Sequence, residues 1–296
     1  MTGAPFASVW TRAPDGLTLH ARLYGLGRVA GRSVVCLPGL TRNSSEFHGL
    51  ATELLALQPE RRIVAVDYRG RGCSDVDPDP SRYTIAVETQ DLLGLLDELG
   101  ITEASFIGVS RGGLIAMALG AARPDLVRAI VLSDIGPVLE RAGLLRIVGY
   151  LGRFGAPASF DAAVEELRAR FGAQFPALSP GDWRDWAETV WTERDGRLVL
   201  AHDPELSRTL AGVDEHSPIP DLWPVFDALR ATPMMVLRGA LSDLLSADTV
   251  AEMARRHPGL EAIEVADEGH TPILHRPALA ARISAFLSRA DEIRPE

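Results

Sequence analysis

The chain has 296 residues, of which 46% are hydrophobic and 24% charged; this is ordinary for a globular protein, and the length allows one domain with an insertion. Its formal net charge of −10 argues against nucleic acid and anionic membrane surfaces as partners. All 30 basic residues are arginines, which excludes lysine Schiff bases, phosphate-loop lysines and serine–lysine dyads.

The two cysteines, Cys36 and Cys73, have no spacing typical of a metal or redox site. We therefore expect a reducing, cytoplasmic location and neither a metal nor an organic cofactor. Residues 1–6 lack the basic and apolar regions of a secretory leader. No apolar run is long enough to cross a bilayer, so we expect no membrane partner.

The first predicted elements are two short strands at 8–11 and 17–24, and the turn signal at 14–16 favours an antiparallel hairpin. Apolar runs then alternate with segments of helical period, which indicates a mostly parallel sheet with helices on both faces. Ligands of such sheets bind beyond the carboxyl ends of the strands. The later strands are predicted at 33–37, 62–66, 105–109, 129–132, 234–237 and 262–265, and the helices at 46–57, 84–99, 111–122, 247–256 and 277–290.

Between residues 136 and 226 this alternation stops, and no strong strand pattern is present. Amphipathic helices are predicted at 139–150, 160–171 and 183–191, and the segment holds Trp183, Trp186 and Trp191. We predict a helical cap at 138–226, inserted into an α/β core made of 1–137 and 227–296. The cap should cover the carboxyl ends of the strands and line a moderately hydrophobic pocket.

The most informative motif is Gly108-Val109-Ser110-Arg111-Gly112-Gly113, which lies between an apolar strand and a predicted helix. Glycines on both sides of a serine allow a tight strand-to-helix turn, because a Cβ at either position would crowd the neighbouring backbone. The turn would expose the Ser110 hydroxyl at the strand tip, near the positive end of the next helix. We interpret Ser110 as a nucleophile.

A serine nucleophile needs a base, and the base needs an orienting acid. His270 follows the last predicted strand and is the best base; the other histidines lie in an early strand, in the insertion or at helix ends. Asp243, after the penultimate strand, is the preferred acid, because the order Ser, Asp, His is then the usual one for this architecture. Asp134, after the strand at 129–132, is the alternative acid.

The oxyanion formed by attack on a carbonyl needs two backbone N–H donors. The N–H of Arg111, directly after the nucleophile, is the first expected donor. The loop after the strand at 33–37 supplies the second, and Leu40, which follows Gly39, is the expected donor. The Arg111 side chain has two interpretations, a site for a substrate carboxylate or an ion pair with a nearby acid, and we favour the ion pair because an unpaired buried charge is costly.

Four motifs, together, resemble the α/β-hydrolase family over nearly the full length of the chain. They are the serine turn at 108–113, Gly239 to Asp243, Glu268-Gly269-His270, and the segment 67–75, similar to the family's D-x-R-G-x-G-x-S-D turn. The resemblance implies an α/β-hydrolase fold, and Arg69 and Asp75 of the last motif are expected to brace their loop. The chain departs from many members by having Pro38-Gly39 in place of His-Gly and an arginine at 111.

A serine at the turn disfavours the dehalogenases and epoxide hydrolases of this family, which use aspartate there. We expect hydrolysis of carboxylic esters of small to medium, moderately hydrophobic substrates. Hydrolysis of a lactone or of a diketone C–C bond, and a cofactor-free peracid-forming oxidation, are alternatives with the same residues. A non-catalytic, hydrolase-like ligand-binding protein is the alternative of another class.

Overall fold

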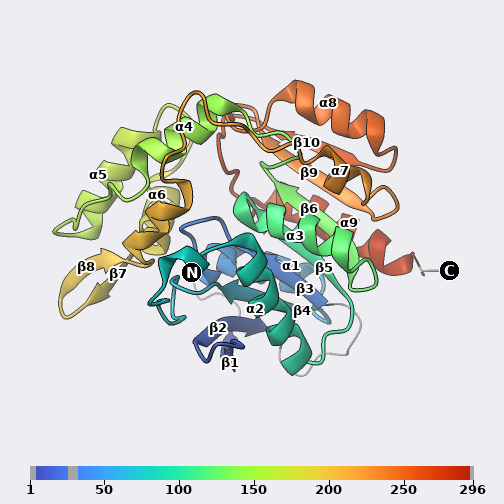
Figure 1. Ribbon diagram of the computed structural model, residues 1–296, viewed down its shortest axis with the longest axis horizontal. Helices are drawn as coiled ribbons and strands as arrows, with labels where there is room; N and C mark the ends of the chain where they lie inside the picture. The colour runs from blue at the N-terminus through green and yellow to red at the C-terminus, as the bar shows by residue number, and fades with distance from the viewer. Residues whose placement is uncertain (1–4, 26–32, 294–296) are drawn as a thin grey trace.

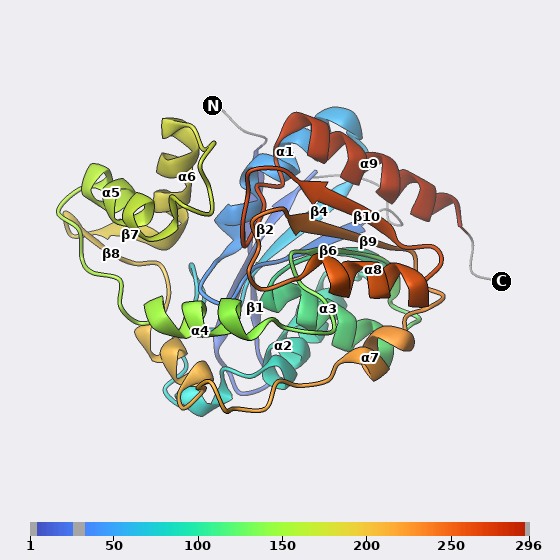
Figure 2. The same cartoon turned by 90° about the horizontal axis from the view of Figure 1, so that it is seen from above.

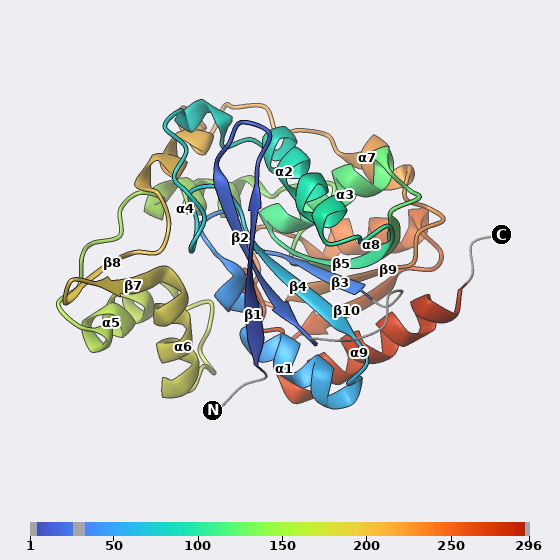
Figure 3. The same cartoon turned by 90° about the horizontal axis from the view of Figure 1, so that it is seen from below.

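The computed structural model describes residues 5–25 and 33–293. Its centre is an eight-stranded sheet with the order β1-β2-β4-β3-β5-β6-β9-β10, in which only the pairs β1–β2 and β2–β4 are antiparallel. The hairpin β1–β2 closes one edge of this sheet (Figure 3). The strands are Phe6–Arg12 (β1), Thr18–Tyr24 (β2), Ser33–Leu37 (β3), Arg62–Asp67 (β4), Ala104–Val109 (β5), Val127–Ser133 (β6), Met234–Gly239 (β9) and Glu261–Val265 (β10).

Helices cover both faces of the sheet, which explains why β3 and β5 are buried along their whole length (Figure 2). Helices α1 (His48–Leu57) and α9 (Pro277–Glu292) pack on one face. Helices α2 (Ile85–Glu98), α3 (Arg111–Ala122) and α7 (Trp223–Asp227) pack on the other, and Met253 of α8 (Ala247–Arg256) joins the same apolar cluster. The predicted α/β architecture is confirmed.

Between β6 and β9, the elements from α4 to η3 lie to one side of the sheet (Figure 1). They have their own apolar cluster, which contains Trp183 stacked on Trp186 with ring centroids 5.3 Å apart. We call residues 138–226 the inserted segment. Its elements are α4 (Arg141–Tyr150), α5 (Phe160–Phe171), α6 (Pro180–Val190), β7 (Trp191–Arg194), β8 (Arg197–Leu200) and the 3-10 helix η3 (Pro204–Leu210).

The inserted segment differs from the sequence prediction in two places. It contains the antiparallel hairpin β7–β8, although no strand was predicted there, because the hairpin is only four residues long on each side. Trp191, predicted as the last residue of a helix, begins β7. At the far end, Phe226 of α7 belongs to the main apolar cluster, so α7 packs with the sheet and not with the segment's own cluster.

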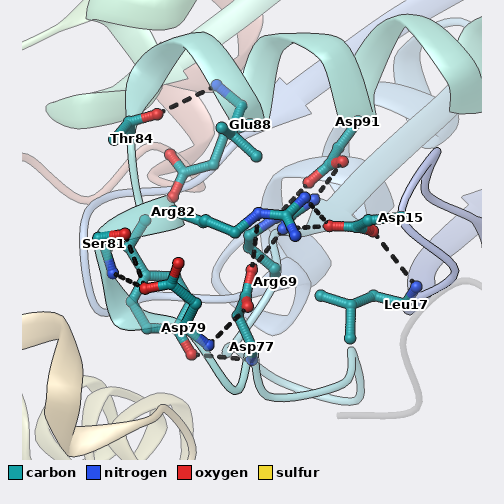
Figure 4. A network of polar contacts seen from close by, with 12 residues as sticks. Asp15, Leu17, Arg69, Asp77, Asp79, Ser81, Arg82, Thr84, Glu88 and Asp91 are labelled. Carbon is teal, nitrogen blue, oxygen red and sulfur yellow. Dashed lines mark hydrogen bonds and ion pairs between the residues drawn. The ribbon is translucent and has the colours of Figure 1, made fainter.

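The loop after β4 is braced by charges, as the 67–75 motif predicted (Figure 4). The buried Arg69 guanidinium forms ion pairs with Asp91 at 2.7 Å, Asp77 at 2.5 Å and Asp15 at 2.9 Å. The Asp75 carboxylate accepts a hydrogen bond from the Thr18 N–H. One arginine thus ties the β1–β2 turn, the loop after β4 and helix α2 together.

This braced loop also meets the inserted segment. Backbone hydrogen bonds join Gly72 N–H to the Ala201 carbonyl and Asp203 N–H to the Gly70 carbonyl. An isolated bridge pairs Arg71 with His202. We call this contact the seam.

Cys36 is buried and Cys73 exposed, and both are free thiols. No helix within the described ranges 5–25 and 33–293 is long and apolar enough to cross a membrane. The expectation about a secretory leader concerns residues 1–4 for the most part, and these lie outside the described residues.

Candidate active site

Ser110 lies at a sharp turn between β5 and α3. Its backbone has φ +50° and ψ −114°, a conformation that L-residues rarely adopt. The turn depends on close backbone contacts that only glycine permits: a Cβ on Gly108 would lie 2.5 Å from the Gly112 carbonyl carbon, and one on Gly112 would lie 2.0 Å from the Leu37 carbonyl oxygen. The Ser110 side chain is thereby presented at the N-terminus of α3.

His270 follows β10 and reaches Ser110 across the carboxyl edge of the sheet. Its Nε2 lies 2.9 Å from Ser110 Oγ, and its Nδ1 lies 2.8 Å from Asp134 Oδ2. A carboxylate oxygen can only accept, so Nδ1 carries the proton and Nε2 is left to accept from the Ser110 hydroxyl. The imidazole is 6% exposed and Asp134 is fully buried, so little water competes for these hydrogen bonds.

Asp134 follows β6, with its backbone at φ +52°. Besides His270, its carboxylate accepts from Gly239 N–H at 2.9 Å and from Ser242 Oγ at 2.5 Å. The Gly239 and Ser242 donors belong to the end of β9 and the loop after it. The acid is therefore fixed between two neighbouring strands before any substrate binds.

The sequence favoured Asp243 as the acid beside His270, and this prediction is wrong. The structure has the alternative acid, Asp134, in that position. Asp243 forms a bidentate ion pair with Arg146 of α4, at 2.6 and 2.9 Å. Burial raises the pKa of Asp243, but the hydrogen bonds and charge of Arg146 outweigh burial and lower it overall. The physical reason for the difference is that α4 lies directly over the loop, where Gly143 N–H donates to the Asp243 carbonyl.

The loop after β3 contains Leu40 and α3 begins at Arg111, and these two residues line the cavity described below together with Ser110. The Gly39 carbonyl accepts from Arg42 N–H at 3.1 Å. Because the peptide unit is planar and trans, this bond also fixes the direction of the Leu40 N–H, which points the opposite way. The Leu40 carbonyl accepts from Arg71 Nε at 2.9 Å, so both peptides that flank Leu40 are held.

Sequence reasoning missed the charged residues that hold this loop. Arg71 and Glu88 are fully buried and form an ion pair at 2.7 Å, and Glu46 Oε2 accepts from Gly39 N–H at 3.4 Å. Burial raises the pKa of Glu46, and the positive charge of Arg42 opposes that rise. Arg71 belongs to the 67–75 motif, but nothing in a single sequence indicates which carbonyl it contacts.

The Arg111 side chain forms an ion pair with Glu88, with Nε 2.7 Å from Oε2. Its Nη2 also donates to the Tyr83 carbonyl at 3.1 Å. Of the two interpretations of this side chain, the structure therefore shows the ion pair. Arg71 and Arg111 thus share the carboxylate of Glu88.

Two adjoining cavities open at this edge. The first, of about 140 Å³, contains Ser110, His270 and the loop 39–42 in its wall. The rest of its lining is mainly apolar and comes largely from the inserted segment: Leu139, Leu144, Ile147, Leu151, Phe154 and Phe171. The second, of about 460 Å³, lies between α1, α6 and the loop after His270. The two share Arg42, Glu46, Val109, Trp186 and Thr271.

One further cluster within the described residues brings together potential metal ligands, His20, Asp67 and Cys73. Asp67 Oδ1 accepts from Ser44 N–H at 2.5 Å, and its Oδ2 contacts His20 Nδ1 at 2.7 Å and Cys73 N–H at 3.0 Å. The carboxylate is thus already engaged by three protein groups. We interpret the cluster as a brace between β2, β4 and the loop before α1.

This fold and site agree with the family comparison. A model of the alpha/beta hydrolase family matches residues 34–283, and the chain belongs to that family. It is 32% identical to the 3-hydroxybutyrate-oligomer hydrolase of Cupriavidus necator, over 88% of this chain and 89% of that protein. It is 28% identical to the 2-(acetamidomethylene)succinate hydrolase of Mesorhizobium japonicum, over 86% and 85%.

Among solved structures, an alpha/beta hydrolase from Novosphingobium aromaticivorans superposes with a TM-score of 0.88 and 37% identity, over 97% of this chain and 99% of that one. The relatives named here are hydrolases, and the protein is a hydrolase of the alpha/beta family.

Proposed function

We propose that this protein is a serine hydrolase that cleaves carboxylic esters through an acyl-enzyme on Ser110. The observation that carries the proposal is the continuous series of hydrogen bonds from the Ser110 hydroxyl through His270 to the buried Asp134 carboxylate. The similarity to a hydrolase of 3-hydroxybutyrate oligomers supports ester chemistry, because an oligomer of a hydroxy acid is joined by ester bonds.

In the proposed reaction, Ser110 Oγ attacks the ester carbonyl while His270 Nε2 takes the hydroxyl proton. Asp134 holds the Nδ1–H and stabilises the imidazolium that forms. His270 then gives its proton to the departing alcohol, which leaves the acyl group on Ser110. One water, deprotonated by His270, releases the acyl group as a carboxylic acid and restores the serine.

The Leu40 and Arg111 N–H groups would stabilise the negative charge on the carbonyl oxygen during both steps. The fixed peptides around Leu40 support this role, since a donor that is already oriented needs no reorganisation when charge develops. Arg111 N–H lies in the first turn of α3, where the helix dipole also favours negative charge. Losing one such donor typically costs about a hundredfold or more in rate.

The first cavity has room for a small acyl group. A cavity of about 150 Å³ in another protein is large enough for benzene, so about 140 Å³ accommodates a short acyl chain. Its apolar lining favours an acyl chain without charge.

The experiment is hydrolysis of p-nitrophenyl esters from acetate to octanoate by the wild type and by Ser110→Ala. We expect turnover that is highest for the short acyl groups and at least about a thousandfold lower in the variant, because the nucleophile is gone. Unchanged turnover in Ser110→Ala would contradict the mechanism. If folded wild type turns over none of these esters, labelling of Ser110 by a fluorophosphonate would favour lactone or C–C hydrolysis, and no labelling would favour a ligand-binding protein.

A further inference from the structure

The Arg42 side chain extends from the loop after β3 to the inserted segment, within the wall shared by the two cavities. Its Nη1 donates to Thr189 Oγ1 of α6 at 2.6 Å. Its guanidinium carbon lies 4.9 Å from the centroid of the Trp186 ring, also on α6. The arginine is thus held in place by one hydrogen bond and one ring, and it borders both cavities.

Two side chains of this wall, Arg42 and Trp186, carry hydrogen-bond donors that no acidic side chain among the described residues occupies. Within the described part of the chain, Arg42 forms no ion pair, whereas Arg111 pairs with Glu88 and Arg146 pairs with Asp243. The Trp186 indole N–H is buried and has no hydrogen-bond partner. A guanidinium is always charged and an indole can only donate, so the missing group is an acceptor, and an anionic one fits best.

One acid, Glu46, borders the same two cavities. Its negative charge raises the pKa of Arg42. Glu46 forms no ion pair with Arg42; its Oε2 accepts from Gly39 N–H instead. Burial lowers the pKa of Arg42, which means that its cationic form lacks full compensation. Glu46 therefore moderates the charge of Arg42 without occupying its donors.

The wall is close to the reacting atoms. A Cβ on Gly39 would lie 3.5 Å from Arg42 Cγ and 3.9 Å from Ser110 Cβ, so both side chains flank the same glycine. An ester at Ser110 with its acyl chain in the apolar first cavity would direct its alcohol part toward the shared wall. Beyond that wall, the second cavity contains the acids Glu53, Asp182, Asp185 and Glu188, which would repel an anion. Arg22 also borders the second cavity, whereas Arg42 is the one cation among the five residues that the two cavities share.

We propose that Arg42 and the Trp186 N–H bind a carboxylate on the alcohol part of the ester, so that the preferred substrates are β-acyloxy carboxylates. In such molecules only the ester oxygen and two carbons separate the scissile carbonyl from the carboxylate, and Arg42 and Ser110 flank the same glycine, Gly39. The inference rests on the proposed function and adds the substrate class. It also moves recognition of a carboxylate from Arg111, whose side chain is occupied, to Arg42.

The test compares 3-butanoyloxybutanoate with sec-butyl butanoate, in which a methyl group replaces the carboxylate. We expect wild type to have the higher kcat/KM with the anionic ester. Arg42→Met should lower kcat/KM for the anionic ester by about 10- to 100-fold, because hydrogen bonds to a charged partner are the strong ones, and should lower that for the neutral ester far less. Trp186→Phe, which keeps the ring and removes the N–H, should give a smaller loss, again specific to the anionic ester.

Arg208→Met is the matched control, since Arg208 is exposed and changes the net charge equally without bordering either cavity. If Arg42 only ties the loop to α6, Arg42→Met will lower stability and affect both esters equally, and the proposal is wrong. Equal loss in Arg208→Met would also overturn it, because the effect would then be one of net charge.

Binding to Ser110→Ala separates this inference from the proposed function. Calorimetry should show tighter binding of the anionic than of the neutral ester, and the difference should disappear when Arg42→Met is added. If the wild type hydrolyses neither ester but this binding difference is present, the esterase assignment fails and the carboxylate site stands. If Ser110-dependent hydrolysis is present without any preference, the carboxylate site fails and the esterase assignment stands.

Discussion

The three side chains of the candidate triad and the two side chains Arg42 and Trp186, which meet at the inserted segment, differ in whether their polar groups have partners. At the edge, Ser110, His270 and Asp134 each contact a partner supplied by the core. In the inserted segment, the Trp186 N–H has no partner, and Arg42, which reaches that segment, pairs with no acid among the described residues. We infer that the core alone sets the chemistry and that the inserted segment, together with the loop after β3, selects the substrate.

The sharpest test of the core side is the choice between its two candidate acids. Asp134→Asn should lower kcat for p-nitrophenyl butanoate by about 10⁴-fold, because an amide beside Nδ1 favours the wrong histidine tautomer. Asp243→Asn should change kcat by only a few-fold, since Asp243 contacts Arg146 and not His270. Urea denaturation of both variants would show that each is folded. A large loss of kcat in Asp243→Asn with full activity in Asp134→Asn would restore the acid preferred from sequence.

The two acids also show where sequence reasoning ends. The serine turn was predictable because Gly108 and Gly112 act within a few residues of Ser110, and the alternation of strands and helices fixed the edge on which His270 lies. The choice of acid depends on contacts between distant segments. Asp134 and Asp243 both follow parallel strands, and only the Gly239 N–H and the position of Arg146 on α4 decide between them.

The same limit applies to the inserted segment. Its helices have an amphipathic period and were predicted, but the hairpin β7–β8 is too short to give a clear alternating pattern. Arg42 and Trp186 are 144 positions apart in the sequence and meet only because α6 lies over the loop after β3. No pattern in a single sequence indicates such a contact.

A second comparison contrasts Gly112, which packs closely against backbone at the serine turn, with Gly94, which has no close contact. Gly112→Ala should lower the free energy of unfolding by about 3 kcal/mol, because the new Cβ would lie 2.0 Å from the Leu37 carbonyl oxygen, on backbone that has little room to move. Gly94→Ala is the control: Gly94 is exposed in α2 with no atom within 4 Å of its added Cβ, and this change should stabilise by up to about 1 kcal/mol. Urea denaturation measures both. If the free energy of unfolding lost in Gly112→Ala is smaller than that gained in Gly94→Ala, close packing does not shape the turn.

The smallest expected effect concerns the seam between the two regions. His202 is 7% exposed there, and its pKa is lowered to about 4, first by burial and then by the positive charges of Arg71 and Arg42, with Asp203 opposing. An ordinary histidine pKa is about 6.5. Between these two values the unfolded chain binds a proton that the folded chain does not, so stability falls as the pH drops.

For His202 this linkage amounts to about 2 kcal/mol of lost stability between pH 7.5 and pH 5. His202→Gln cannot take up the proton, so its free energy of unfolding should decline by about 2 kcal/mol less than that of wild type over the same interval, measured by urea denaturation at each pH. His216→Gln is the control, because His216 lies in the inserted segment but its side chain is 85% exposed. If His202→Gln follows the wild-type decline, the seam does not exclude water from His202. The inserted segment would then be tied to the core more loosely than its backbone hydrogen bonds at residues 70–72 indicate, and substrate selection would rest on the Arg42 contact with α6.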